Sequence, residues 1–191
     1  MVETDPEIPL HKLMPDAPVV QVLADNDRLN SIIKNLLRSD ADYMIMAEAR
    51  EGLALDTAVK LASKGSRRMK ITYHMREPLN FPYDVAGEIV GSKGGDIHYM
   101  AKKVASSFDY IFHFIQLSDK SRKKLKSIHE LTYDRNSDSI SMTAICEYDC
   151  LTDSWKWTNV LSEDKQKAAL EENPDTYNKL REILAELGEV S

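Results

Sequence analysis

The chain has few cysteines and no long apolar run, and both absences restrict its class. Cys146 and Cys150 are its only two cysteines. Their spacing fits neither a Cys-x-x-Cys redox pair nor a zinc site with a second ligand pair, so we expect reduced thiols in a cytoplasmic protein. No run of about 18 apolar residues occurs, which excludes a transmembrane helix. The acidic amino end lacks an apolar core, so we expect no secretory signal.

Positive charge is also in short supply. The chain has 25 Lys and Arg against 31 Asp and Glu, a net charge of -6, which disfavours a nucleic-acid scaffold. Residues 67–70 are interpreted as a solvated loop, with a contact to a phosphate or a partner as the alternative, and residues 120–126 as a solvated entry to a hairpin. With 191 residues, 42% hydrophobic and 29% charged, the chain is an ordinary globular sequence that can bury a sizeable core.

Two short segments that we expect to be strands, the first of them a continuous apolar run, end in polar side chains. Residues 43–47 are followed by Glu48, and residues 69–73 are followed by His74. Runs of this length are typical of strands covered on both faces, and the carboxyl ends of parallel strands form the edge where ligands bind open α/β sheets. We therefore expect Glu48 and His74 to meet at one edge of a sheet. The alternative is that each residue ends a strand only because the chain leaves the core there.

The rest of the chain divides into a first part with mixed elements and a second part with strands. The first part predicts strands at residues 19–23 and 110–117 and helices at residues 28–38, 52–62, 84–90 and 96–107. Residues 110–117 form the most apolar of these runs, and we expect that strand to be buried. The second part alternates with a period of two, which predicts antiparallel strands at residues 125–133, 139–148 and 154–160. Residues 162–191 are acidic and predict helix, interrupted near Asn173 and Pro174.

The order of these motifs resembles that of the secretion and pilus-assembly ATPases, the hexameric motors of type II and type IV secretion and of type IV or Tad pili. In that family, a strand ending in Gly-Glu-x-Arg is the Walker B motif, and a strand ending in Thr-x-His is the His box. This sequence has Ala-Glu-Ala-Arg at residues 47–50 and Thr-Tyr-His at residues 72–74. Residues 2–10 resemble the Asp box, with Thr4 where the family has Asp. The sequence departs from the family pattern at two further positions. Ala47 replaces the Walker B glycine, and Ser66 stands where a second histidine is usual.

The resemblance implies a fold and a domain organisation. It implies an α/β fold with a RecA-like twisted sheet, flanking helices, an antiparallel strand extension and a carboxyl-terminal helix. Residues 1–160 would be a partial RecA-like ATPase core, and residues 161–191 an acidic helical tail without a counterpart in the family.

The resemblance also implies roles for individual residues. Glu3, Glu48 and His74 would be catalytic, Glu7 and Arg50 would contact the nucleotide, and Glu48 would hold Mg²⁺ through water. These types suit the roles, because carboxylates bind Mg²⁺ and its waters and a histidine near a phosphate can donate a hydrogen bond. The implied cofactors are ATP and Mg²⁺. The implied partners are further copies of the chain in a six-membered ring and an inner-membrane secretion or pilus platform, with no nucleic acid.

One part of an ATPase is missing from this sequence. The P-loop pattern Gly-x-x-x-x-Gly-Lys-Ser/Thr does not occur, so nothing supplies the amides and the lysine that hold the β- and γ-phosphates. We therefore expect this chain alone not to hydrolyse ATP. It would be the carboxyl-terminal part of a longer motor, which predicts self-association or marginal stability in isolation. It would otherwise be a degenerate paralogue, or an α/β interaction module that acts as an assembly or regulatory partner.

Overall fold

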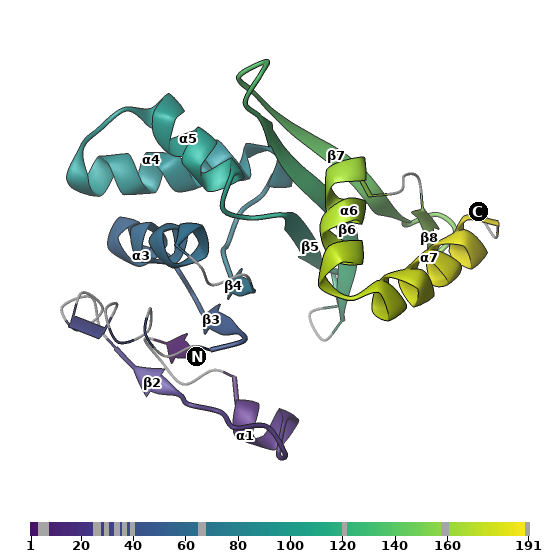
Figure 1. Cartoon of the computed structure of the whole chain (residues 1–191), viewed down its shortest axis with the longest axis horizontal. Coiled ribbons are helices and arrows are strands. Elements are labelled where there is room, and N and C mark those ends of the chain that lie inside the picture. The colour runs from purple at the N-terminus through teal and green to yellow at the C-terminus, as the bar shows by residue number, and fades with distance from the viewer. Residues whose placement is uncertain are drawn as a thin grey trace. The chain divides into compact units, whose positions relative to one another are not determined.

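The structure, a computed structural model, describes residues 1–3, 8–24, 28, 31, 32, 35, 38, 41–64, 68–119, 122–157 and 161–189. The predicted helix at residues 28–38 lies mostly outside these residues, as does Glu7. The chain divides into two compact units, unit 1 at Met1–Phe108 and unit 2 at Asp109–Ser191. The fold is mixed α/β, with a parallel four-stranded sheet and a separate antiparallel four-stranded sheet (Figure 1). The boundary at residue 160 that the sequence suggested falls inside unit 2, because residues 110–157 and the terminal helices belong to one compact unit.

Unit 1 is organised on four very short parallel strands. They are β1 (Val2–Glu3), β2 (Val22–Leu23), β3 (Met44–Met46) and β4 (Met69–Ile71), in the order β2-β1-β3-β4. The chain moves from β1 to one side and then returns to its other side for β3 and β4. The direction in which successive strands are added to the sheet therefore reverses, and this switch lies between β1 and β3. At such a switch, the carboxyl ends of the strands form the kind of crevice in which open α/β sheets bind ligands.

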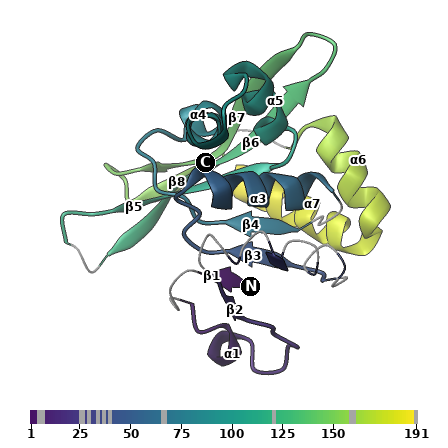
Figure 2. The ribbon, with the colours of Figure 1, turned by 90° about the vertical axis from the view of Figure 1, so that its left-hand side faces the viewer.

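The core of unit 1 lies in its helices, because strands of two or three residues bury little. These are α3 (Gly52–Ser63), α4 (Phe81–Lys93) and α5 (Ile97–Ala105), with the four-residue α1 (Leu10–Leu13) and the 3₁₀ turn η1 (Pro78–Asn80) as minor elements. Among the described residues of unit 1, the largest fully buried aliphatic side chains are Leu55, Val59, Leu61, Val85, Ile89 and Val104. Helix α3 packs against β4 and α4, and Figure 2 shows it alongside β4, with β3 and β1 beyond.

Local sequence signals place these helices well. Helix α3 covers the predicted residues 52–62, and α5 begins after Asp96, whose carboxylate accepts a hydrogen bond from the Tyr99 amide at 2.7 Å. Helix α4 is longer than predicted. It begins at Phe81, and Pro82 lies in its first turn, where proline is tolerated. It ends where Gly94 takes a φ of 76° and donates its amide to the Val90 carbonyl.

Unit 2 is a meander of four antiparallel strands followed by two helices. The strands are β5 (Tyr110–Gln116), β6 (Lys123–Asp134), β7 (Ser139–Asp149) and β8 (Ser154–Trp157), and each pairs with the next. Helices α6 (Glu163–Glu172) and α7 (Pro174–Glu189) follow. The predicted antiparallel strands and the break near Asn173 are confirmed. The Ser162 amide donates to the buried Glu130 carboxylate at 3.0 Å and Lys165 pairs with Asp109, which fixes α6 to the sheet.

The expectation that residues 110–117 form a buried strand is wrong. Side-chain burial alternates along β5, and Phe112 and Phe114 are 57% and 62% exposed. Strand β5 lies at the edge of an antiparallel sheet, where one face can remain open to solvent. An unbroken apolar run does not reveal this, because the exposed positions are phenylalanines.

Within the described part of the chain, no helix combines the length and the apolar character that crossing a membrane requires.

Candidate functional site

The structure brings Glu48 and His74 together at the carboxyl ends of neighbouring strands. Strands β3 and β4 run parallel and in register, and both residues follow them closely in the chain. The Glu48 Oε1 atom lies 3.8 Å from His74 Nε2 and also accepts a hydrogen bond from the Arg50 guanidinium. The Glu48 side chain is 16% exposed, whereas those of Arg50 and His74 are 62% and 79% exposed. A shielded carboxylate thus sits behind two accessible hydrogen-bond donors.

The backbone at Glu48 is held in an unusual conformation. Its φ is 53°, in the left-handed region that side chains other than glycine rarely adopt. Such a conformation costs about 1–3 kcal/mol and persists only where its surroundings fix it. Thr72 supplies the fixing contacts, since its Oγ1 accepts from the Glu48 amide at 2.7 Å and its carbonyl accepts from the Ala49 amide at 3.2 Å.

Thr72 is a site residue that the sequence reasoning did not select. It positions Glu48 rather than offering chemistry of its own, and it comes from the adjacent strand end. The only sequence signal was a hydroxyl two residues before His74. That signal gains meaning only once β3 and β4 are known to be neighbours.

Glu3 is placed differently from the other predicted site residues. It ends β1, next to β3, and is 1% exposed. One of its carboxylate oxygens accepts from the Ile8 amide at 3.0 Å, and the other accepts from the Gln21 side-chain amide. These bonds tie the end of β1 to the segments before α1 and before β2. Glu3 therefore has a clear structural role at the sheet edge.

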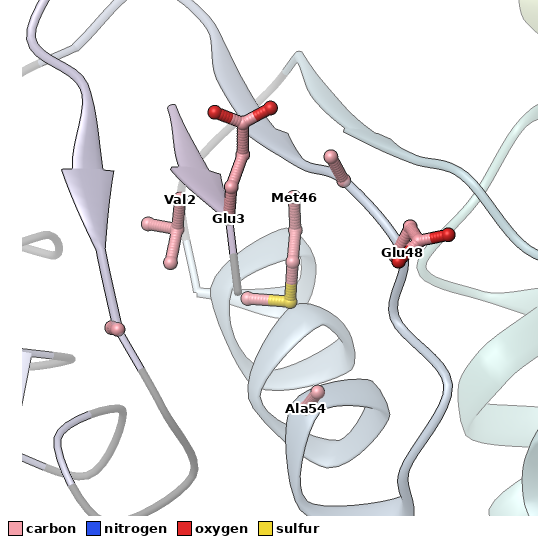
Figure 3. Close-up of a pocket in the computed structure, with 7 residues that line it drawn as sticks. Val2, Glu3, Met46, Glu48 and Ala54 are labelled. Atoms are coloured by element: carbon pink, nitrogen blue, oxygen red, sulfur yellow. The ribbon is translucent and has the colours of Figure 1, made fainter. Parts of the chain in front are cut away.

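A small pocket lies between the two acidic strand ends. It is lined by Val2, Glu3, Ala24, Met46, Ala47, Glu48 and Ala54. Figure 3 shows Glu3 and Glu48 on either side of Met46, with their carboxylates directed away from each other. The pocket is thus mostly apolar inside, and the two acids stand at its margins instead of sharing one site.

Two side chains of unit 1 that do not line this pocket, Asp56 and Tyr73, have clearly shifted pKa values. Burial tends to raise the pKa of Asp56 on α3, but its bonds to Lys60 and Lys93 outweigh burial and hold that pKa below the ordinary value. Burial, with the nearby charges of Glu88 and Asp84, raises the pKa of Tyr73. The ion pairs of Asp56 join α3 to α4, so they serve the scaffold behind the site.

The donor set for a metal at this edge is small. Among the described residues, no three His, Cys, Asp or Glu side chains gather in a way that could hold a metal ion. Mg²⁺ in nucleotide sites commonly takes one or two carboxylates, waters and substrate phosphates. Glu48 fits one such carboxylate through water, with one oxygen beside Arg50 and His74. Glu48 would therefore be one ligand of a larger metal site and would not form a complete site.

Of the predicted nucleotide contacts, Arg50 lies in this cluster, and Glu7 lies outside the described residues. Comparison of the sequence with protein-family models and with curated proteins finds no match. The roles of Glu3, Glu48, His74 and Arg50 in catalysis or nucleotide binding therefore stay predictions.

Proposed function

We propose that the chain is the carboxyl-terminal part of a secretion or pilus-assembly motor ATPase, a RecA-like domain that couples ATP hydrolysis to protein or pilin export. The observation that carries the proposal is the meeting of Glu48 and His74, 3.8 Å apart, at the ends of adjacent parallel strands. Their motifs resemble the Walker B motif and the His box, and an ATPase site needs them side by side.

Unit 1 would supply the acid and donor side of the nucleotide site. Mg²⁺, when bound with the phosphates, would neutralise charge that develops on the transferred phosphoryl group. Glu48 would hold a water of that ion and orient the attacking water. His74, which is largely exposed, would donate a hydrogen bond to the γ-phosphate, and Arg50 would neutralise Glu48 or turn outward to a phosphate. Glu3 would keep the sheet edge and the pocket margin in place.

The phosphate cradle would come from a P-loop-bearing polypeptide or segment that this sequence does not include. In the proposed assembly, copies form a six-membered ring on an inner-membrane secretion or pilus platform, on the cytoplasmic side. A P-loop in the reading frame upstream of Met1 would favour the longer motor over a degenerate paralogue.

A second candidate function is a non-catalytic α/β interaction module that regulates or assembles a motor. This candidate is favoured because the acidic side chains at the strand ends already have bonding partners within the chain. Both oxygens of Glu3 accept bonds from unit 1, and Glu48 is paired with Arg50. In this case the acids would hold the sheet edge and bind no nucleotide.

The test mixes this chain with a P-loop-bearing amino-terminal fragment of a secretion ATPase and measures Mg²⁺-ATP turnover. We expect no turnover by the chain alone and measurable turnover by the mixture. Glu48→Gln should lower that turnover by a factor of about 100 or more, because it removes a group that acts in the transition state. Glu51→Gln is the matched control, since Glu51 is an exposed neighbour just before α3.

Two results decide against the proposal as stated. Turnover by the chain alone that is lost on Glu48→Gln would show that no separate P-loop is needed. A mixture that forms a stable complex by sedimentation but hydrolyses no ATP would favour the interaction module. Pull-down of the fragment by the Glu48→Gln variant separates lost chemistry from lost assembly.

A further inference from the structure

One face of unit 2 carries a row of exposed aromatic side chains. Tyr110, Phe112 and Phe114 are 36%, 57% and 62% exposed, and alternate residues of a strand share a face. Ile128 and Leu125 of β6 lie opposite Phe112 and Phe114 and are half-buried. We call Phe112, Phe114, Leu125 and Ile128 the aromatic face. Contiguous exposed apolar side chains bordered by polar residues can mark binding surfaces.

Basic side chains gather at one end of the aromatic face. Lys123 lies opposite Gln116 at the far end of β5, and Arg122 precedes it. Lys126 is the extra residue of a β-bulge, since its neighbours Leu125 and Ser127 pair with consecutive residues of β5. All three bases are exposed. The aromatic face therefore favours an apolar partner that carries negative charge beside its apolar residues.

Helix α7 has these properties. Its apolar residues recur at helical spacing, and Leu180 and Ile183 are 37% and 52% exposed although they lie on one stripe. Glu182 and Glu186 are exposed and flank Ile183. A helix of 16 residues is about 24 Å long, and a strand of 7 residues spans about 23 Å, so the two surfaces match in length.

Helix α7 is held against α6 and β8 of its own copy. The Tyr177 ring is buried and its hydroxyl donates to Gln166 Oε1 at 2.8 Å, which fixes α7 to α6. Helix α7 also contacts β8, and β8 and β5 are opposite edges of the sheet. A contact between α7 of one copy and the aromatic face of another leaves both of these contacts in place.

Symmetric contacts between copies are less favourable. Two α7 helices side by side would bring like charges together, because the described side chains of α7 include three acids, Asp175, Glu182 and Glu186, against two bases, Lys179 and Arg181. Pairing of two β5 edges would meet the stronger local twist that the bulge at Lys126 of the neighbouring strand β6 produces, and such twist protects edge strands from pairing.

We propose that unit 2 assembles head to tail, with α7 of one copy lying on the aromatic face of the next. Leu180 and Ile183 pack against Phe112 and Phe114, and Glu182 and Glu186 approach the bases at the end of the face. Such a contact uses two different surfaces, so repetition produces a closed ring or an open filament. It uses only unit 2 and does not depend on nucleotide chemistry in unit 1.

The test measures the size of the full chain by sedimentation velocity over a range of concentrations. We expect the unchanged chain to associate, and Phe114→Glu and Ile183→Glu each to weaken association at least about tenfold. Leu151→Glu, at a loop position of unit 2 that is 91% exposed, is the matched control and should associate normally. Raising the salt concentration should weaken association of the unchanged chain.

An equimolar mixture of the two variants gives the sharpest result. Phe114→Glu keeps an intact α7, and Ile183→Glu keeps an intact aromatic face. The mixture should therefore form one-to-one dimers and nothing larger, although each variant alone is monomeric. A symmetric contact through either surface would not produce this dimer.

Several outcomes would overturn the proposal. One is an unchanged chain that stays monomeric at all concentrations, and another is a mixture of variants that does not dimerise. A third is salt-sensitive retention of a single-stranded oligonucleotide that is lost on Phe114→Glu, without self-association, which would assign the face to nucleic acid. Unchanged melting of each variant, measured by circular dichroism, ensures that the substitutions act at the surface.

Discussion

Unit 1 and unit 2 each contain a four-stranded sheet, yet they place their polar and apolar groups in opposite ways. In unit 1 the strands have only two or three residues, the helices hold the core, and the notable polar side chains follow the strand ends. In unit 2 the strands run to 12 residues, and the exposed aromatic side chains lie along a strand face. A parallel sheet buries both faces and leaves its ends for chemistry, whereas an antiparallel sheet can leave a whole face for binding.

The largest expected effect tests the core of unit 2. Leu131 is 1% exposed, so Leu131→Ala should destabilise unit 2 by about 2–5 kcal/mol through lost burial and a residual cavity. Both tryptophans lie in β8, so tryptophan fluorescence during chemical denaturation reports unit 2. Leu151→Ala, at an exposed position, should leave the transition in place. Equal destabilisation of unit 1, measured by amide hydrogen exchange in α3 and α4, would contradict separate units.

The next effect tests helix packing in unit 1. A Cβ on Gly52 would lie 2.3 Å from the Glu88 carbonyl oxygen and from Ser92 Oγ. Because that carbonyl belongs to helix α4, Gly52→Ala should cost about 1–3 kcal/mol by overpacking. The matched control is Gly87→Ala, where the added methyl group meets nothing within 4 Å and should stabilise α4 by about 0.5–1 kcal/mol. Hydrogen exchange in α3 and α4 reports both changes, and the tryptophan transition should stay unchanged.

A smaller effect concerns acid sensitivity in unit 1. The pKa of Asp56 is lower in the folded chain than its ordinary value of 3.8, so ionised Asp56 stabilises unit 1 above that pH. This stabilisation is lost as the pH falls through the folded pKa. Asp56→Asn should cost about 1–2 kcal/mol near neutral pH and remove this part of the acid dependence. Hydrogen exchange at several pH values measures it, and Asp42→Asn, at an exposed position, should behave like the unchanged chain.

The smallest effect concerns alkaline sensitivity in unit 2. Burial, with Glu130 and Asp109 nearby, raises the pKa of Tyr110 from 10.0 to about 12. The neutral phenol therefore contributes its full stability below pH 10, and that contribution is lost as the pH rises toward the folded pKa. Tyr110→Phe should flatten the loss of stability in this range, measured by tryptophan fluorescence. The same loss in Tyr110→Phe and in the unchanged chain would assign it to other groups.

The predicted elements agree with the structure where the signal was local. A capping side chain at Asp96 and the alternation in β6 and β7 each act within a few residues. Pro82 was interpreted as part of a connection, yet it lies in the first turn of α4. The terminal helices and their break at Asn173 were also readable, because apolar spacing and proline fix them within single segments. The exposure of one face of β5 could not be predicted from the sequence, since it depends on which elements pack against that face of the sheet.

The candidate site was predicted only in part for the same reason. The sequence identified Glu48 and His74 as strand ends, but their separation of 3.8 Å depends on β3 and β4 being neighbours. The role of Thr72 and the left-handed conformation of Glu48 need that neighbour as well. Glu3 and Glu48 were expected to converge, yet their carboxylates point away from each other across Met46 (Figure 3).

The sequence by itself determined where most of the helices and strands form, since hydrophobic period, caps and turn residues act locally. It also determined that the strand ends of unit 1 carry acids and a histidine. Only the tertiary structure decided which strand ends are adjacent, which carboxylates bond to the chain itself and which aromatic side chains stay exposed. These depend on contacts between residues far apart in the chain, and no local pattern specifies them.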